Sequence, residues 1–139
     1  MFQHVLVHLD LKGAPPKASY IIKLLPMLKE LGATGLLIEY EDTFPYSENL
    51  EKYASKERYT VHQITKIISE AKNHNLAVIP LVQTFGHSEW ILKHENFGSL
   101  REDPEDPRAF CPSQEGTLDL IKTIVDQVTV QCYSKQKSH

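Results

Sequence analysis

The segment PLVQTFGHSEW, residues 80–90, follows an apolar run with a histidine, a carboxylate and an indole. His87 can orient a carboxylic acid, carry a proton or bind a metal, because its imidazole changes charge close to neutral pH. Gly86 permits the tight backbone turn that would present this histidine. Trp90 could form a flat wall for the apolar face of a sugar ring, or it could simply belong to the core. The segment therefore predicts a functional turn around His87, although loop histidines are also common as plain surface or packing residues.

Sequence motifs for metal, phosphate or nucleophile chemistry are absent from the chain. His87-Ser88-Glu89 matches the H-x-E half of the zinc deaminase signature, but the P-C-x-x-C half is missing and Cys111 precedes its proline instead of following it. No HExxH, GxxxxGK[ST], GxGxxG or GxSxG pattern occurs. We therefore expect no metal and no cofactor.

Composition is that of one ordinary globular domain, with 139 residues, 41% of them hydrophobic and 24% charged. A net charge of −3 gives no electrostatic reason to expect nucleic acid or a membrane surface as a partner. The N-terminus lacks a signal-peptide pattern, and no apolar stretch reaches the ~20 residues of a membrane span. Since Cys111 and Cys132 form no disulfide framework, a reducing compartment, cytosol or nucleus, is expected.

Three apolar runs separated by helical periodicity predict parallel strands, because strands joined through helices run in the same direction with right-handed crossovers. The expected strands cover residues 5–10, 35–40 and 77–83. Gly32 is placed to end the first helix, which Pro26 should kink. Thr60 and Gln63 form a capping-box signature at the start of the second helix. The class is α/β, and either a doubly wound sheet or part of a (β/α)₈ barrel would suit it.

The segments between and after these elements are predicted from polar and proline-rich composition. Residues 41–59 are expected to form a long polar connection, and residues 88–94 a short helix. Residues 101–113, REDPEDPRAFCPS, predict a Pro-rich loop, after which Ser113 should cap the last helix. The expected buried stripe of that helix consists of Leu118, Ile121, Val125 and Val128. The ending YSKQKSH predicts a polar tail.

Side-chain alternation gives each expected strand one wholly apolar face and one face that turns polar toward its C-terminal end. The residues at these polar ends are Asp10, Glu39, Glu41 and Gln83. In a barrel they would converge on one pocket at the mouth, with Asp42 and the His87 turn on its rim. Strands also end in polar residues simply because they emerge into solvent. In all three strands the polar ends lie on the same face of the sheet, and this agreement favours the pocket.

Three long blocks, HLDLKGAPPK, LGATGLLIEYEDTFPY and VIPLVQTFGHSEWILKH, closely resemble the N-terminal half of the barrel of the family 20 glycoside hydrolases. The resemblance implies that residues 1–127 form about three βα units of a (β/α)₈ TIM barrel with parallel strands. Residues 128–139 do not resemble the family and are expected to form a separate tail. The activity implied is β-N-acetylhexosaminidase, the hydrolysis of terminal N-acetylhexosamines, so the implied partner is a β-N-acetylhexosaminide sugar.

The family mechanism is substrate-assisted, with the acetamido oxygen of the substrate attacking the anomeric carbon. An aspartate orients that acetamide, and the adjacent glutamate, after the fourth strand, protonates the leaving group. By the resemblance, His87 matches a histidine that supports this glutamate, and Glu41 or Asp42 matches the acidic partner. The pocket residues implied are Asp10, Lys12, Glu39, Gln83 and Trp90. Lys12 lies where the family usually has an arginine, and it lacks the bidentate geometry of a guanidinium.

The catalytic Asp-Glu dipeptide does not occur anywhere in these 139 residues. We therefore expect a chain truncated before that pair, with no catalytic residue of its own and no activity alone. The alternatives are a non-enzymatic truncated or splice product, acting as a partner-binding half-barrel or without function, and a small independent α/β binding domain. A partial barrel should also self-associate through exposed strand edges. The apolar lumen residues expected to lack facing partners are Leu6, Leu37, Ile79 and Leu81.

Overall fold

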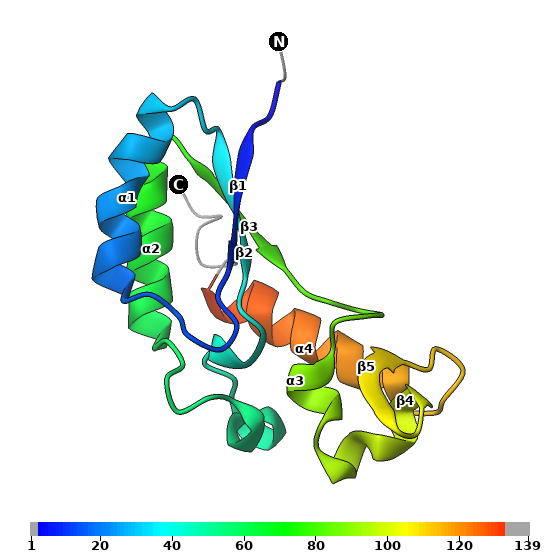
Figure 1. Ribbon diagram of the computed structural model, residues 1–139. Helices are drawn as coiled ribbons and strands as arrows, with labels where there is room; N and C mark the ends of the chain where they lie inside the picture. The colour runs from blue at the N-terminus through cyan, green and yellow to red at the C-terminus, as the bar shows by residue number, and fades with distance from the viewer. Residues whose placement is uncertain (1–2, 133–139) are drawn as a thin grey trace.

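Three parallel strands, in the order β1-β2-β3, form the centre of the fold. Their bounds are β1 (Leu6–Asp10), β2 (Gly35–Glu39) and β3 (Ala77–Leu81). The computed structural model describes residues 3–132, and Figure 1 shows the strands side by side next to a pair of helices. The register aligns Asp10 with Glu39, and Glu39 with Leu81. The predicted α/β class with parallel strands is therefore confirmed, and the carboxyl ends of all three strands meet at one edge of the sheet.

Helices α1 (Ala18–Glu30) and α2 (Val61–Asn73) pack against each other along one face of this sheet (Figure 1). Gly32 ends α1 as predicted: it has φ +94°, and its N–H donates to the Lys29 carbonyl at 3.0 Å. The capping box of α2 is also present. The Gln63 N–H donates to Thr60 Oγ1 at 3.2 Å, and the Thr60 N–H donates to Gln63 Oε1 at 2.8 Å. Pro26 lies inside α1, where the predicted kink stays a prediction.

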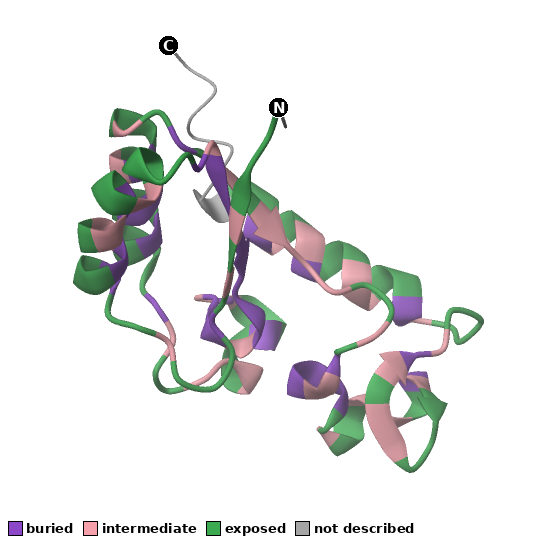
Figure 2. Ribbon diagram, turned by 45° about the horizontal axis from the view of Figure 1, so that its top comes forward, coloured by how far each residue is buried: buried purple, intermediate pink, exposed green. Residues whose placement is uncertain are grey.

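The central strand β2 is mostly buried, whereas β1 and β3 are exposed or intermediate (Figure 2), and the two faces of the sheet differ as well. On the face toward the helices, Leu36 and Ile38 are 0% exposed. On the other face, Leu6 is 40% and Ile79 is 44% exposed, while Leu37 and Leu81 are half-buried. Within the described residues, therefore, this second face has no covering layer, as expected for the lumen side of a partial barrel.

The connection between β2 and α2 is not the simple polar loop that the sequence suggested. It contains two 3₁₀ helices, η1 (Glu41–Thr43) and η2 (Glu48–Tyr53). The large side chains buried there are Phe44, Tyr46, Leu50 and Tyr59. That prediction was wrong because irregularly spaced aromatic residues can anchor a loop to the core without producing a helical or strand period.

The Pro-rich loop expected over residues 101–113 is instead mainly a β-hairpin. Strands β4 (Arg101–Asp103) and β5 (Asp106–Phe110) pair antiparallel. The Glu105 N–H donates to Asp103 Oδ1 at 3.0 Å, which stabilises the turn between them. Pro107 is tolerated because β5 is an edge strand. The order of elements thus includes a hairpin that the alternation of strands and helices did not predict.

The chain after β3 continues through α3 (Glu89–Leu92), η3 (Glu95–Leu100), the hairpin and α4 (Thr117–Cys132). The short helix expected at residues 88–94 is present as α3. The last helix begins at Thr117 and not near Ser113, because Gly116 has φ +89° and Thr117 Oγ1 donates to the Cys111 carbonyl at 2.9 Å. These contacts hold residues 111–116 as a turn before the helix starts.

The buried face of α4 also differs from the predicted stripe. Val128 is buried as expected, but Leu118 is 71% exposed and Ile124 is 2% exposed. Ile121 and Val125 are partly buried, so the predicted stripe is correct from Ile121 onward and wrong at Leu118, and the burial of Ile124 was missed. Residue 127, the predicted family boundary, lies inside α4, and that division stays a prediction. The tail YSKQKSH lies outside the described residues, and no described helix is long and apolar enough to cross a bilayer.

Candidate functional site

Glu39, at the end of β2, joins the polar ends of all three strands. It is 4% exposed, and both of its carboxylate oxygens have partners. His8 Nε2 lies 3.0 Å from Glu39 Oε2, and Gln83 Nε2 donates to Glu39 Oε1 at 2.8 Å. The structure thus brings together two of the pocket residues expected from the sequence. His8 was missed as a site residue, although it lies on the same strand face as Asp10.

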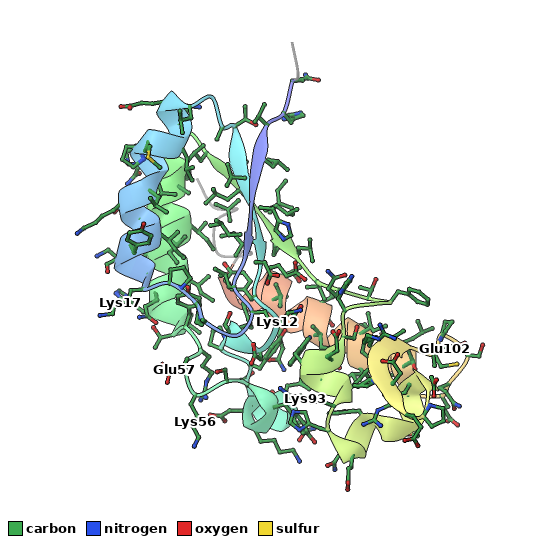
Figure 3. The ribbon with its side chains drawn as sticks, viewed as in Figure 1. Lys12, Lys17, Lys56, Glu57, Lys93 and Glu102 are labelled. Carbon is green, nitrogen blue, oxygen red and sulfur yellow. The ribbon has the colours of Figure 1, made fainter. Side chains whose placement is uncertain are left out.

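Lys12, which is labelled in Figure 3, forms a second polar contact at this edge with Glu41. Lys12 Nζ donates to Glu41 Oε1 at 3.0 Å, and the Glu41 side chain is only 2% exposed. Asp10 Oδ1 accepts a hydrogen bond from the Lys12 backbone N–H at 3.1 Å, which fixes the loop that carries the lysine. Lys12 therefore serves as the counter-ion of a buried carboxylate in η1, just after the next strand.

The pKa of Glu41 is raised to about 7. Burial is the main cause, and the hydrogen bond and charge of Lys12 only partly oppose it. Glu41 Oε2 has no hydrogen-bond partner among the described residues, and the same holds for Asp42 Oδ1 and Glu89 Oε2. Buried acceptors without donors are costly, so these carboxylates are suited to meet donors from a ligand or from other parts of a larger protein.

Glu41 should make folding stability depend on pH near neutrality. Its folded-state pKa of about 7 exceeds the ordinary 4.5, so the folded state keeps a proton that the unfolded state has already lost. The free energy of unfolding should therefore fall as the pH rises from about 4.5 to about 7, by up to about 3 kcal/mol. Urea unfolding at several pH values should show this slope, and Glu41→Gln should remove it.

The matched control for this pH dependence is Glu102→Gln, because Glu102 is exposed on β4. That variant should keep the slope of the parent chain. An unchanged slope in the Glu41→Gln variant would show that Glu41 titrates normally and would contradict the prediction.

The turn at His87 has a strained backbone and is hydrogen-bonded to β5. His87 has φ 54° and Glu41 has φ 45°, so two predicted site residues adopt the left-handed region that side chains disfavour. We expected Gly86 to make this turn, but His87 itself takes the left-handed conformation. Strand β5 holds the turn in place, since the Ser88 N–H donates to the Arg108 carbonyl at 3.0 Å. The His87 side chain is exposed and makes no hydrogen bond within the described residues.

Trp90 packs as a core residue, one of the two possibilities raised by the sequence. It is 5% exposed, and its indole stacks on Tyr46 with ring centroids 5.0 Å apart and planes 6° from parallel. Helix α3 contacts η1, and the space between Trp90, Glu41 and Gln83 is a cavity of about 10 Å³. That volume is marginal even for one water molecule. In this structure the indole therefore fixes α3 against the end of β2 and is not open to a sugar.

Sequence comparison links the chain to hexosaminidase D. It is 49% identical to hexosaminidase D from Bos taurus over 123 residues, which cover 88% of this chain and 36% of the relative. It is 47% identical to hexosaminidase D from Homo sapiens over 138 residues, or 99% of this chain and 28% of the relative. The chain thus spans about a third of the length of these curated relatives. No family model matches it.

Solved structures show where this fold occurs. The GH20 β-N-acetylhexosaminidase from Streptomyces coelicolor A3(2) matches with a TM-score of 0.73 and 15% identity, over 92% of this chain and 30% of that protein. A mutant Streptomyces plicatus β-hexosaminidase in complex with the product GlcNAc matches with a TM-score of 0.76 and 13% identity, over 95% and 31%. The chain is therefore a homologue of part of hexosaminidase D, and its fold matches part of a GH20 catalytic domain.

Proposed function

We propose that this chain forms part of the catalytic barrel of a β-N-acetylhexosaminidase and supplies residues that support its acid/base group. The observation that carries the proposal is Glu41, a buried carboxylate on a strained backbone at the start of η1, just after β2. Its Oε1 is paired with Lys12, and its Oε2 has no donor among the described residues. A buried acceptor without a donor and a strained backbone both cost folding free energy, and proteins keep such features where function requires them. The substrate class is a terminal β-linked N-acetylhexosamine.

The role of this chain in the reaction is positioning. His87 would hold the acid/base glutamate of the complete barrel in place, and Glu41 or Asp42 would stabilise the imidazolium that forms when that histidine takes a proton. Lys12 offsets the charge of Glu41, and Glu39 is held from two neighbouring strands by His8 and Gln83. The substrate's own acetamide would supply the nucleophile.

The 139-residue polypeptide alone should be inactive, because it contains no Asp-Glu dipeptide. A chimera tests the proposal directly: this chain replaces the matching segment of 138 residues in Homo sapiens hexosaminidase D. The chimera should hydrolyse a chromogenic N-acetylglucosaminide or N-acetylgalactosaminide, and the isolated chain should not.

Two results would overturn this proposal. Turnover by the purified 139-residue polypeptide would show that the supporting role is not its whole function. A chimera that is monomeric, folded and inactive would favour the non-enzymatic alternative, a partner-binding half-barrel. Circular dichroism and size-exclusion chromatography of the chimera separate that case from simple misfolding.

A further inference from the structure

A second concave surface lies between the loop after β1 and the start of α2, away from the Glu39 and Glu41 contacts. This basic groove has a volume of about 840 Å³, and residues 13–19 and 56–59 form much of its two walls. The cationic side chains that line it are Lys17, Lys56, Arg58 and Lys66. Glu57 is the single carboxylate among the lining residues. Lys17, Lys56 and Glu57 lie near the starts of α1 and α2 (Figure 3).

The charge of this groove is opposite to that of the chain. Its lining residues carry four cations and one carboxylate, or +3, whereas the whole chain carries −3. Lys17, Lys56 and Lys66 form no ion pair within the described residues. Arg58 lies 3.4 Å from Glu51, and its Nη1 also donates to the Ser55 carbonyl at 3.2 Å. Concentrated like charges repel one another, and an anionic ligand relieves that repulsion.

The groove is also held together across its two walls. The Tyr59 hydroxyl donates to the Pro16 carbonyl at 2.5 Å, and Tyr59 is 4% exposed. This buried bond ties the loop before α1 to the loop before α2, and the two helices pack directly on each other. The spacing between Lys17 on one wall and Lys56 on the other therefore does not depend on flexible loops alone.

We propose that the basic groove binds a small ligand that carries at least two oxyanion groups, either phosphate or sulfate. Cations on both walls suit two separate negative groups, and the volume is in the range of small-molecule sites and far exceeds one phosphate ion. The acidic charge of the chain as a whole favours such a ligand over nucleic acid, which requires a broad basic surface. This assignment is independent of the proposed hexosaminidase function.

Isothermal titration calorimetry of the 139-residue chain at low ionic strength tests the proposal with inorganic pyrophosphate, fructose 1,6-bisphosphate, uncharged fructose and an oligothymidylate. Pyrophosphate and the bisphosphate should bind more tightly than the oligothymidylate, and fructose should not bind. Tighter binding of the bisphosphate would identify a sugar-borne ligand, and tighter binding of pyrophosphate a free polyphosphate. Failure of both anions to bind would overturn the proposal, as would tighter binding of an oligothymidylate.

Paired variants locate the binding. Lys17→Ala with Lys66→Ala should weaken anion binding at least about tenfold, because each substitution removes a charge-assisted contact that the groove would make with an oxyanion. The control pair, Lys72→Ala with Lys93→Ala, removes the same charge from exposed positions that do not line the groove, and it should change affinity less than about twofold. Equal losses in both pairs would overturn the assignment. If the first pair does not fold, Lys56→Ala alone gives the same test from an exposed loop.

Discussion

Replacing His87 with asparagine in the chimeric hexosaminidase D is expected to lower kcat about 10- to 100-fold, with a smaller change in KM. Asparagine tolerates the left-handed backbone that His87 adopts at φ 54°, so the loss would come from the missing imidazole and not from a refolded turn. Steady-state kinetics on a chromogenic N-acetylhexosaminide measure the effect. Because the imidazole supports a proton donor, the pH dependence of kcat should change as well.

The control for this experiment is His4→Ala, since His4 is exposed and precedes β1. That variant should keep the kcat and pH profile of the parent chimera. An unchanged kcat and pH profile in the His87→Asn chimera would show that His87 does not support the acid/base glutamate.

The same chimera can identify the acidic partner of His87. Lys12 Nζ already donates to Glu41 at 3.0 Å, whereas Asp42 forms no ion pair within the described residues and has a buried Oδ1 without a partner there. Asp42→Asn should therefore reduce kcat more than Glu41→Gln does. The reverse order would assign the role to Glu41.

Gly35→Ala should destabilise the 139-residue chain by about 1–3 kcal/mol, a large share of the stability of a small domain. A Cβ at Gly35 would lie 2.7 Å from the Ala77 carbonyl oxygen and 2.9 Å from Leu6 Cδ2. The carbonyl belongs to a neighbouring strand and cannot move without disturbing the sheet. Urea denaturation followed by circular dichroism measures the loss.

Gly86→Ala is the matched control for Gly35, because a Cβ there would meet nothing within 4 Å. It should change the free energy of unfolding by less than about 0.5 kcal/mol. Equal stability of the Gly35→Ala chain and the parent would mean that β1, β2 and β3 are not packed at the spacing described above.

Local sequence rules predicted those parts of the fold whose signals are contained in a few neighbouring residues. The capping box of Thr60 and Gln63 and the stop at Gly32 are of this kind, because each depends on bonds within one turn of backbone. The alternation of side chains along the strands also predicted that Glu39 and Gln83 lie on the same face of the sheet, where Gln83 donates to Glu39.

The features that were missed depend on contacts between distant segments. Ile124 of α4 lines a small cavity together with Leu81 and Trp90, and backbone hydrogen bonds join β5 to the turn after β3. His8 gains its place in the site only through Glu39, which lies 31 positions later in the chain. No pattern within residues 5–10 specifies that partner.

The pairing of β5 with the turn after β3 makes the position of His87 a property of a larger cooperative unit. The Phe110 N–H donates to the Phe85 carbonyl at 2.9 Å, and Phe110 is 1% exposed. The amides of Ser88 and Phe110 should therefore exchange with solvent in the same opening event, which ties the histidine to a segment over twenty residues away. Substitutions in the hairpin can therefore change the stability of that turn, although no residue of the turn itself is altered.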